Sequence, residues 1–211
     1  MTGMPIIDHL RFVDPPWVQL LVLKKRQDFD FRSLQNQLSE FVIKVIDGSK
    51  CKRRSDLFSE LAHLFEFPSY FGYNWDALDE CITDLEWMPG RGYVLFIKNA
   101  DQLLSEDVQD SYAIFIGIMK KAGEEWSIPQ GGEWARPAVP FHVVLIVSDR
   151  KRNTREDWFY QRLVLIQTLP YDPASQVTNI LHQLTATSSQ INKADYVYNN
   201  GRQRKGVGSL F

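Results

Sequence analysis

The residue types best suited to chemistry fall on one short segment of this 211-residue chain, positions 75–85. At about 100° per residue, a helix over this segment places its apolar residues beside Trp75 on one arc. The opposite arc holds polar residues: Asp76, Asp79, Glu80, Thr83 and Asp84. The segment contains no basic residue, and like charges four positions apart destabilise a helix by ~0.2–0.5 kcal/mol per pair. The pattern therefore predicts an acidic face whose countercharge is supplied by a cationic partner.

The loop before this helix is rich in aromatic residues. Tyr70, Phe71 and Tyr73 surround Gly72, and Asn74 is suited to cap the helix because its side-chain oxygen can accept a backbone hydrogen bond. An exposed Tyr70 or Phe71 would place an aromatic anchor beside charged hydrogen-bond acceptors, a combination typical of binding hot spots. Packing of these rings on neighbouring helices explains the same pattern equally well, so both interpretations stay open.

Around these segments, apolar periodicity predicts alternating strands and helices. Continuous apolar runs at 93–98 and 141–148 are typical of strands that are buried on both faces of a parallel sheet. The expected core elements are a strand at 41–47, a helix at 55–67 capped by Ser55, the helix at 75–85, a strand at 93–98, a helix at 107–125 and a strand at 141–148. This order predicts an α/β fold in which helices pack on a small parallel sheet of three core strands.

The flanking segments are expected to add to this core. We divide the chain into an N-terminal extension at 1–40, a domain at 41–149, a C-terminal extension packed on it at 150–187, and a flexible tail at 188–211. Within the extensions we predict a strand at 17–24, a short helix at 33–40, a strand at 163–169 and a helix at 173–187. The added strands would extend the sheet at its edges.

Composition and charge narrow the functional classes. The chain has no apolar run near the ~20 residues of a membrane span and no signal-peptide pattern at its start. Its two cysteines, Cys51 and Cys81, form no disulfide framework, so we expect a reducing compartment, the cytoplasm. The net charge is only −2, but positions 51–110 hold 12 acidic and five basic residues. That local excess would attract a cationic partner and repel nucleic acid.

The stretch PSYFGYNWDALDECITDL at 68–85 resembles the signature of the barstar family, roughly P-x-Y-Y-G-x-N-L/W-D-A-L-W-D-C-L-T. The two agree at nine positions: Pro68, Tyr70, Gly72, Asn74, Asp76, Ala77, Leu78, Cys81 and Thr83. The resemblance covers about residues 41–149, where the expected order of elements also matches the small three-stranded parallel sheet of that family.

The resemblance implies a protein inhibitor that inserts this helix and its preceding loop into the active site of a guanyl-type ribonuclease. Asp76 and Glu80 would then take the places of RNA phosphates, and Tyr70 would pack on the catalytic histidine of the target. Ten residues are expected to contact the partner: Tyr70, Phe71, Gly72, Tyr73, Asn74, Asp76, Asp79, Glu80, Thr83 and Asp84. The expected partner is a cognate ribonuclease or nuclease toxin domain, the chain acting as an immunity protein without cofactor or metal.

The chain departs from the family pattern at several positions. Phe71 replaces a usual Tyr, Asp79 stands where the family often has Trp, and Glu80 is one methylene longer than the usual Asp. A further acid expected on the third helix has no counterpart at 119–121, where the residues are Met, Lys and Lys. These departures bear on the identity of the target more than on the mode of binding.

Two other classes of function compete with an inhibitor. Asp76 and Glu80 could form the acid–base pair of a glycoside hydrolase, but an exposed helix face lacks the walls that separate two carboxyl pKa values. The four histidines, His9, His63, His142 and His182, show no metal-ligand spacing. Nucleic-acid binding could use the basic residues of the C-terminal part, which are Arg150, Lys151, Arg152, Arg155, Arg202, Arg204 and Lys205. A barstar-like module that binds a protein other than a nuclease also stays open.

Overall fold

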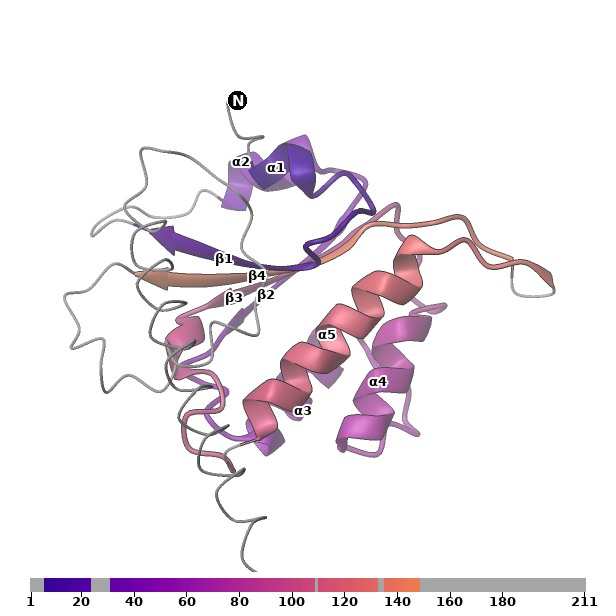
Figure 1. The fold of residues 1–211 in the computed structure, drawn as a ribbon. Helices are drawn as coiled ribbons and strands as arrows, with labels where there is room; N and C mark the ends of the chain where they lie inside the picture. The colour runs from indigo at the N-terminus through magenta and orange to yellow at the C-terminus, as the bar shows by residue number, and fades with distance from the viewer. Residues whose placement is uncertain (1–5, 24–30, 109, 133–134, 149–211) are drawn as a thin grey trace, which may run out of the picture. The chain divides into compact units, whose positions relative to one another are not determined.

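The computed structural model describes residues 6–23, 31–108, 110–132 and 135–148. Within these ranges, four strands form one sheet in the order β1-β4-β3-β2, and every neighbouring pair is parallel (Figure 1). The strands are β1 (Val18–Leu23), β2 (Val42–Asp47), β3 (Tyr93–Lys98) and β4 (Phe141–Ser148). The predicted α/β fold with three parallel core strands is confirmed, and β1 extends the sheet at one edge.

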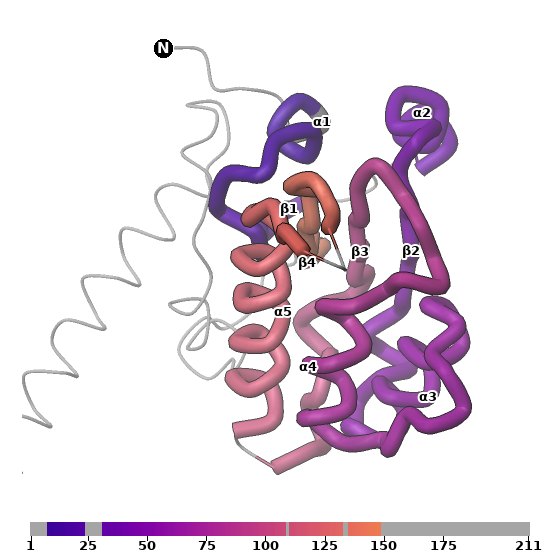
Figure 2. The backbone as a smooth tube through the Cα atoms, turned by 90° about the vertical axis from the view of Figure 1, so that its right-hand side faces the viewer, coloured from indigo at the N-terminus to yellow at the C-terminus, as the bar shows by residue number. Residues whose placement is uncertain are grey.

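Helices cover both faces of this sheet, as Figures 1 and 2 show from two directions. One face carries α1 (Ile6–His9) and α2 (Phe31–Gln37). The other carries α3 (Arg54–Leu64), α4 (Trp75–Asp84) and α5 (Ser111–Ser127). Because helices lie on both sides, the central strands β3 and β4 are buried along all but their last residue. A 3-10 turn, η1 (Ala100–Gln102), follows β3.

The core beneath α1 and α2 is built from alternate side chains of the central strands, those that point toward these two helices. Val94 and Phe96 of β3 and Val144 and Ile146 of β4 are buried there. The helical side of the same cluster consists of Leu10, Leu34 and Leu38. Phe31 and Leu34 of α2 and Leu38 just after it recur at helical spacing on the side that faces the sheet, which explains why α2 forms here.

On the other face, α5 packs closely against the sheet and against α4. Its inward residues Phe115, Ile116 and Met119 are fully buried. Gly123 lies against Trp17, the residue before β1, and a Cβ on this glycine would overlap the tryptophan side chain. A residue without a side chain is therefore required where the helix crosses the start of the edge strand.

The bounds of two helices differ from the prediction, and the two starts differ for a physical reason. The helix expected from Ser55 begins at Arg54 and ends at Leu64, and no side chain of its own segment caps it. Instead the Arg54 N–H donates to Asp107 Oδ2 at 2.5 Å, across a gap of 53 residues. Asp107, expected to open the third helix, is thus used as a cap elsewhere, and α5 begins only at Ser111.

The predicted strand at 163–169, the predicted helix at 173–187 and the tail at 188–211 lie outside the described residues. The division of the chain at 40, 149 and 187 stays a prediction, although β1 of the N-terminal part pairs with β4 along its whole length. In the part of the chain that the structure describes, no helix is both long and apolar enough to cross a membrane.

Candidate partner-binding surface

The helix α4 is fixed at both ends and along its inner face. Asn74 caps its start, since the side-chain Oδ1 accepts from the Ala77 N–H at 2.9 Å, and Leu85 ends it in a left-handed conformation with φ of 46°. The inner residues Leu78, Cys81 and Ile82 are buried. The cap and the amphipathic pattern agree with the sequence prediction, so the direction in which the polar arc faces is determined.

Three carboxylates of this arc lie in solvent. Asp76, Glu80 and Asp84 are exposed, and within the described residues none of them forms an ion pair or accepts a side-chain hydrogen bond. Some acids elsewhere on the described chain do form ion pairs: Glu106 pairs with Lys52 at 3.0 Å and Glu40 with Arg91 at 3.6 Å. The α4 row therefore keeps its charge available for a partner.

The fourth acid of the polar arc, Asp79, does not fit the prediction of an unpaired acidic face. Asp79 is half-buried between α4 and α5 and is ion-paired with Lys121, which also lies 3.5 Å from Glu125. The hydrogen bond to Asp79 raises the pKa of the Lys121 ammonium above its ordinary value. The countercharge comes from a helix 42 residues away, which the pattern within segment 75–85 could not indicate.

Thr83 is also occupied within its own helix. Its Oγ1 lies 2.8 Å from the Asp79 carbonyl and 3.1 Å from that of Glu80. The hydroxyl hydrogen is therefore used in the preceding turn, and Thr83 is left with acceptor capacity only.

The two interpretations of the aromatic loop apply to different residues. Tyr70 and Tyr73 are 70% and 59% exposed, whereas Phe71 is only 5% exposed. Phe71 packs on Phe67 with ring centroids 4.9 Å apart, and at the same separation on the ring of Tyr73. Phe71 is thus a core residue that supports the loop, and it is unavailable as a surface anchor.

Tyr70 lies in the field of the acidic row. Partial desolvation, and then the negative potential of neighbouring groups that include Asp84, Glu86 and Glu80, raise the pKa of its hydroxyl. The phenol is therefore neutral at ordinary pH and can donate a hydrogen bond next to carboxylates that can only accept. Glu86, exposed just after α4, is an acid that the predicted site omitted because it lies past the end of the helix.

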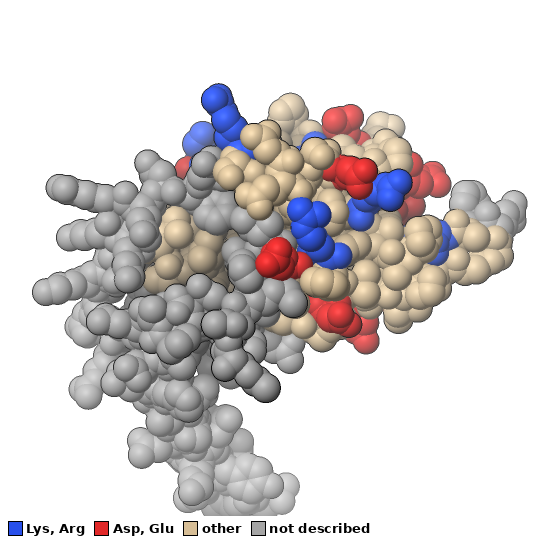
Figure 3. All heavy atoms as spheres, turned by 90° about the horizontal axis from the view of Figure 1, so that it is seen from above, with Lys and Arg blue, Asp and Glu red and all other residues tan. Residues whose placement is uncertain are grey.

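The described surface seen from the α1 and α2 side has a different character. In Figure 3, basic and acidic side chains are interspersed over that face and do not separate into regions of one sign. The described face of α1 and α2 therefore shows no acidic row like that of α4. The net charge of −2 gives no indication of this difference.

Among the described residues, the metal-ligating side chains and the two cysteines are candidates for chemistry. The described residues contain no group of three or more histidine, cysteine or acidic side chains arranged to hold a metal. Burial raises the pKa of the Cys51 thiol to about 12, and burial also raises that of Cys81. Both thiols are free and buried, so neither has the thiolate character that a nucleophile needs.

The geometry thus defines a small parallel α/β fold that exposes an acidic helix and two tyrosines on one face. The family model described as Barstar (barnase inhibitor) matches residues 41–146, which is half of the chain and includes all ten predicted contact residues. This protein belongs to that family, and the family is one of inhibitors. The comparison with curated proteins gives no match.

Proposed function

We propose that this protein binds a ribonuclease and blocks its active site with the outer face of α4 and the loop before it. The observation that carries the proposal is the row of Asp76, Glu80 and Asp84, which are exposed without ion pairs beside the exposed Tyr70 on a domain of an inhibitor family. A ribonuclease must bind a polyanion, so its active site is cationic. A fixed row of carboxylates is complementary to such a site.

The unpaired row costs free energy in the isolated protein and returns it in the complex. Repulsion between Asp76 and Glu80, and between Glu80 and Asp84, opposes the helix by ~0.2–0.5 kcal/mol per pair. Cations of the partner would relieve this repulsion. Close charge pairs between barnase and barstar, the namesake of this family, have coupling energies of about 1.5–7 kcal/mol. Inhibition follows from occlusion and requires no chemical step, so the protein is not an enzyme.

The structure also supports a division of roles among the ten predicted residues. Tyr70, Tyr73, Asp76, Glu80 and Asp84 are the exposed groups that we assign to direct contact. Phe71, Gly72 and Asn74 shape the loop and cap the helix. Asp79 and Thr83 are engaged in contacts within the protein. We further propose a cytoplasmic immunity role, which two free cysteines favour because such thiols persist in a reducing compartment.

The test measures inhibition of a panel of guanyl-type ribonucleases that includes barnase. We expect Asp76→Ala and Glu80→Ala each to weaken inhibition of the most tightly bound member by at least about 100-fold, or ~2.7 kcal/mol. Asp14→Ala, which removes an exposed acid before β1, is the matched control and should leave inhibition unchanged. Circular dichroism confirms that each variant is folded. Failure to inhibit any panel member, or equal inhibition by both variants and wild type, contradicts the proposal.

A further inference from the structure

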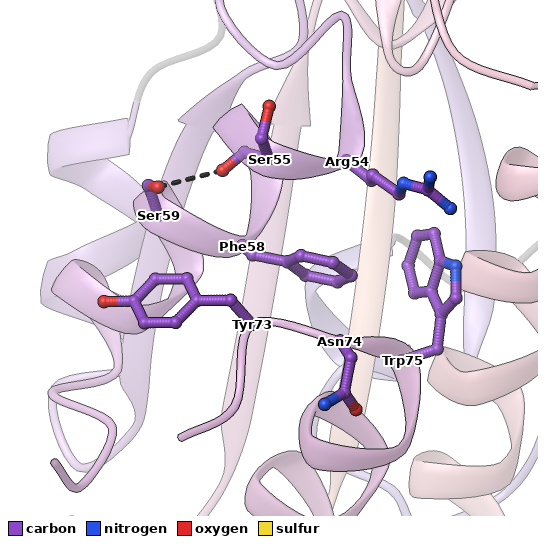
Figure 4. Close-up of a pocket in the computed structure, with 7 residues that line it drawn as sticks. All are labelled: Arg54, Ser55, Phe58, Ser59, Tyr73, Asn74 and Trp75. Atoms are coloured by element: carbon purple, nitrogen blue, oxygen red, sulfur yellow. Dashed lines mark hydrogen bonds between the residues drawn. The ribbon is translucent and has the colours of Figure 1, made fainter. Parts of the chain in front are cut away.

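A pocket of ≈ 300 Å³ lies between the first turns of α3 and the loop that leads into α4 (Figure 4). It is lined by Arg54, Ser55, Phe58, Ser59, Tyr73, Asn74 and Trp75. Two of these residues, Tyr73 and Asn74, belong to the loop of the proposed binding surface, and Asp76 follows the last of them. The pocket is thus continuous with that surface, although no sequence pattern pointed to its α3 side.

The wall of the pocket is largely aromatic. The ring centroids of Phe58 and Trp75 are 4.8 Å apart at an interplanar angle of 74°, and Phe58 is buried, so this wall is rigid. Tyr73 stands at the edge with a backbone φ of 49°, a conformation that is uncommon for a residue with a side chain. Such backbone strain persists where the surroundings hold it, and here it keeps an exposed ring beside the opening.

Two polar side chains of the lining are engaged within the protein. Ser59 Oγ donates to the Ser55 carbonyl at 2.8 Å, and Asn74 is used as the cap of α4. The Arg54 side chain is 53% exposed, and its Nε is 4.0 Å from Asp107 Oδ1. Within the described residues, no hydrogen bond is made by the Arg54 guanidinium.

Asp107 forms an ion pair with this cation at 4.0 Å but accepts no hydrogen bond from the guanidinium. Its two carboxylate oxygens already accept from the Arg54 N–H at 2.5 Å, from Ser111 Oγ at 2.8 Å and from the Val108 N–H at 2.7 Å. The guanidinium is planar and offers five donors, which suit a carboxylate in a two-pronged arrangement. The mouth of the pocket therefore holds a half-exposed guanidinium beside an aromatic wall, and within the described residues its hydrogen-bond donors are unused.

We infer that the pocket receives an apolar side chain of the bound protein, next to a carboxylate of that protein which pairs with Arg54. This inference rests on the proposed function, because continuity with the α4 surface identifies the occupant as part of the same partner. The volume is at the lower limit of ~300–1,000 Å³ for ligand sites and suits one side chain. The partner group next to this side chain should be a carboxylate, because Arg54 is the charged residue of the lining and a carboxylate is complementary to it.

The binding surface would then carry negative charge on α4 and positive charge at the start of α3, at fixed positions. A partner must present cations to α4 and a carboxylate to the start of α3. A partner docked in the reversed direction would place like charges together at both ends, which costs several kcal/mol. The pocket would thus select among cationic nucleases and fix their orientation, whereas the acidic row alone accepts any sufficiently basic cleft.

The first experiment examines the pocket without a protein partner. N-acetyl-phenylalanine and its amide are titrated into the protein to about 20 mM, since contacts of this size give millimolar binding. The signals of the Trp75 indole N–H and the Ser59 amide are followed by NMR. We expect both signals to shift, with the carboxylate binding several-fold more tightly than the amide, and the difference to vanish in Arg54→Met. Unchanged signals, or equal binding of the two probes, overturn the inference.

The second experiment uses the panel member that wild type inhibits most tightly. Ser59→Trp fills the pocket from an exposed position of α3, and we expect it to weaken binding by about tenfold or more, ~1.4 kcal/mol. Ser39→Trp, at an exposed serine after α2, is the control and should have no effect. Arg54→Met distinguishes two models, because they predict changes of affinity in opposite directions. If only overall charge matters, removal of a cation should strengthen binding to a basic protein. If the pocket is used, the same change should weaken binding.

The outcomes separate the two proposals. If Asp76→Ala weakens inhibition while Ser59→Trp and Arg54→Met do not, the pocket inference is overturned and the proposed function stands. If no panel member is inhibited, the proposed function is overturned, and the probe titration alone decides whether the pocket has the stated preference.

Discussion

Four acids on α4 share a helix but not an environment. Asp76, Glu80 and Asp84 are exposed without ion pairs, whereas Asp79 is turned toward α5 and held by Lys121. For a partner approaching α4, Lys121 therefore offsets the charge of Asp79 and makes the local field less negative.

Removal of this lysine gives a prediction at the scale of single residues. We expect Lys121→Met to raise the association rate with the inhibited ribonuclease a few-fold, because the change adds to the negative field that steers a cationic partner. Lys120→Met is the control for general charge, since the neighbouring Lys120 forms no ion pair with the described residues. Stopped-flow fluorescence measures both rates. An equal or slower rate for Lys121→Met than for Lys120→Met would mean that Asp79 plays no part in the field.

Residues at element boundaries act through the position of a whole helix. The contrast between α3 and α4 is instructive, because both were expected to carry a local cap. Asn74 provides it for α4 from within the loop, but the start of α3 is satisfied by Asp107 from a distant segment. The acidic row is thus oriented by a local interaction, and the pocket beside it depends on a long-range one.

The cap of α4 gives a prediction at the scale of elements. We expect Asn74→Ala to lower the free energy of unfolding by about 1 kcal/mol, the usual cost of losing an N-cap. Asn74→Ser keeps a capping oxygen and should recover most of that loss. Asn36→Ala, an exposed change in α2, is the matched control. Urea unfolding measures all three, and a loss in Asn74→Ala no larger than in Asn36→Ala would contradict the role of the cap.

At the scale of the whole molecule, a buried histidine joins the N-terminal segment to the family domain. His142 lies in β4, and its Nε2 donates to the carbonyl of Phe12 at 2.8 Å. Nδ1 is then an acceptor, with Gln19 Nε2 at 3.4 Å, so the neutral ring satisfies both neighbours. The ring of His9 lies against it, with centroids 5.2 Å apart. A proton on Nδ1 would face the amide hydrogens of Gln19, which no longer have an acceptor there.

The protonation of His142 gives a prediction for the pH dependence of stability. Burial lowers the pKa of His142 from 6.5 to about 4. The unfolded chain therefore binds a proton as pH falls below 6.5 while the folded protein does not, so stability is lost from that pH down to about 4. The full difference amounts to about 3 kcal/mol. Above pH 6.5 this group has no further effect.

The measurement compares urea unfolding at about pH 7 and about pH 5. We expect wild type and His63→Gln, which changes an exposed histidine of α3, to lose stability alike over this interval. His142→Gln should lose clearly less, because it has no imidazole to protonate in the unfolded chain. A slope in His142→Gln as steep as in wild type would show that the buried histidine does not control this dependence.

The sequence alone determined the features that depend on neighbouring residues. The apolar runs of β3 and β4, the amphipathic pattern of α4 and the Asn74 cap are all local, and each is found where it was predicted. The motif at 68–85 indicated the family for the same reason, since its residues form one loop and one helix. The exposure of Asp76, Glu80 and Asp84 followed from the same periodicity.

Only the tertiary structure decided what depends on residues far apart in the chain. The pairing of Asp79 with Lys121, the capping of α3 by Asp107 and the contact of His9 with His142 each join segments that no periodicity links. Charge and polarity reveal what a side chain can bind. Which partner it meets is set by how strands and helices pack, and that packing places a cation beside one acid of α4 and leaves three of its carboxylates in water.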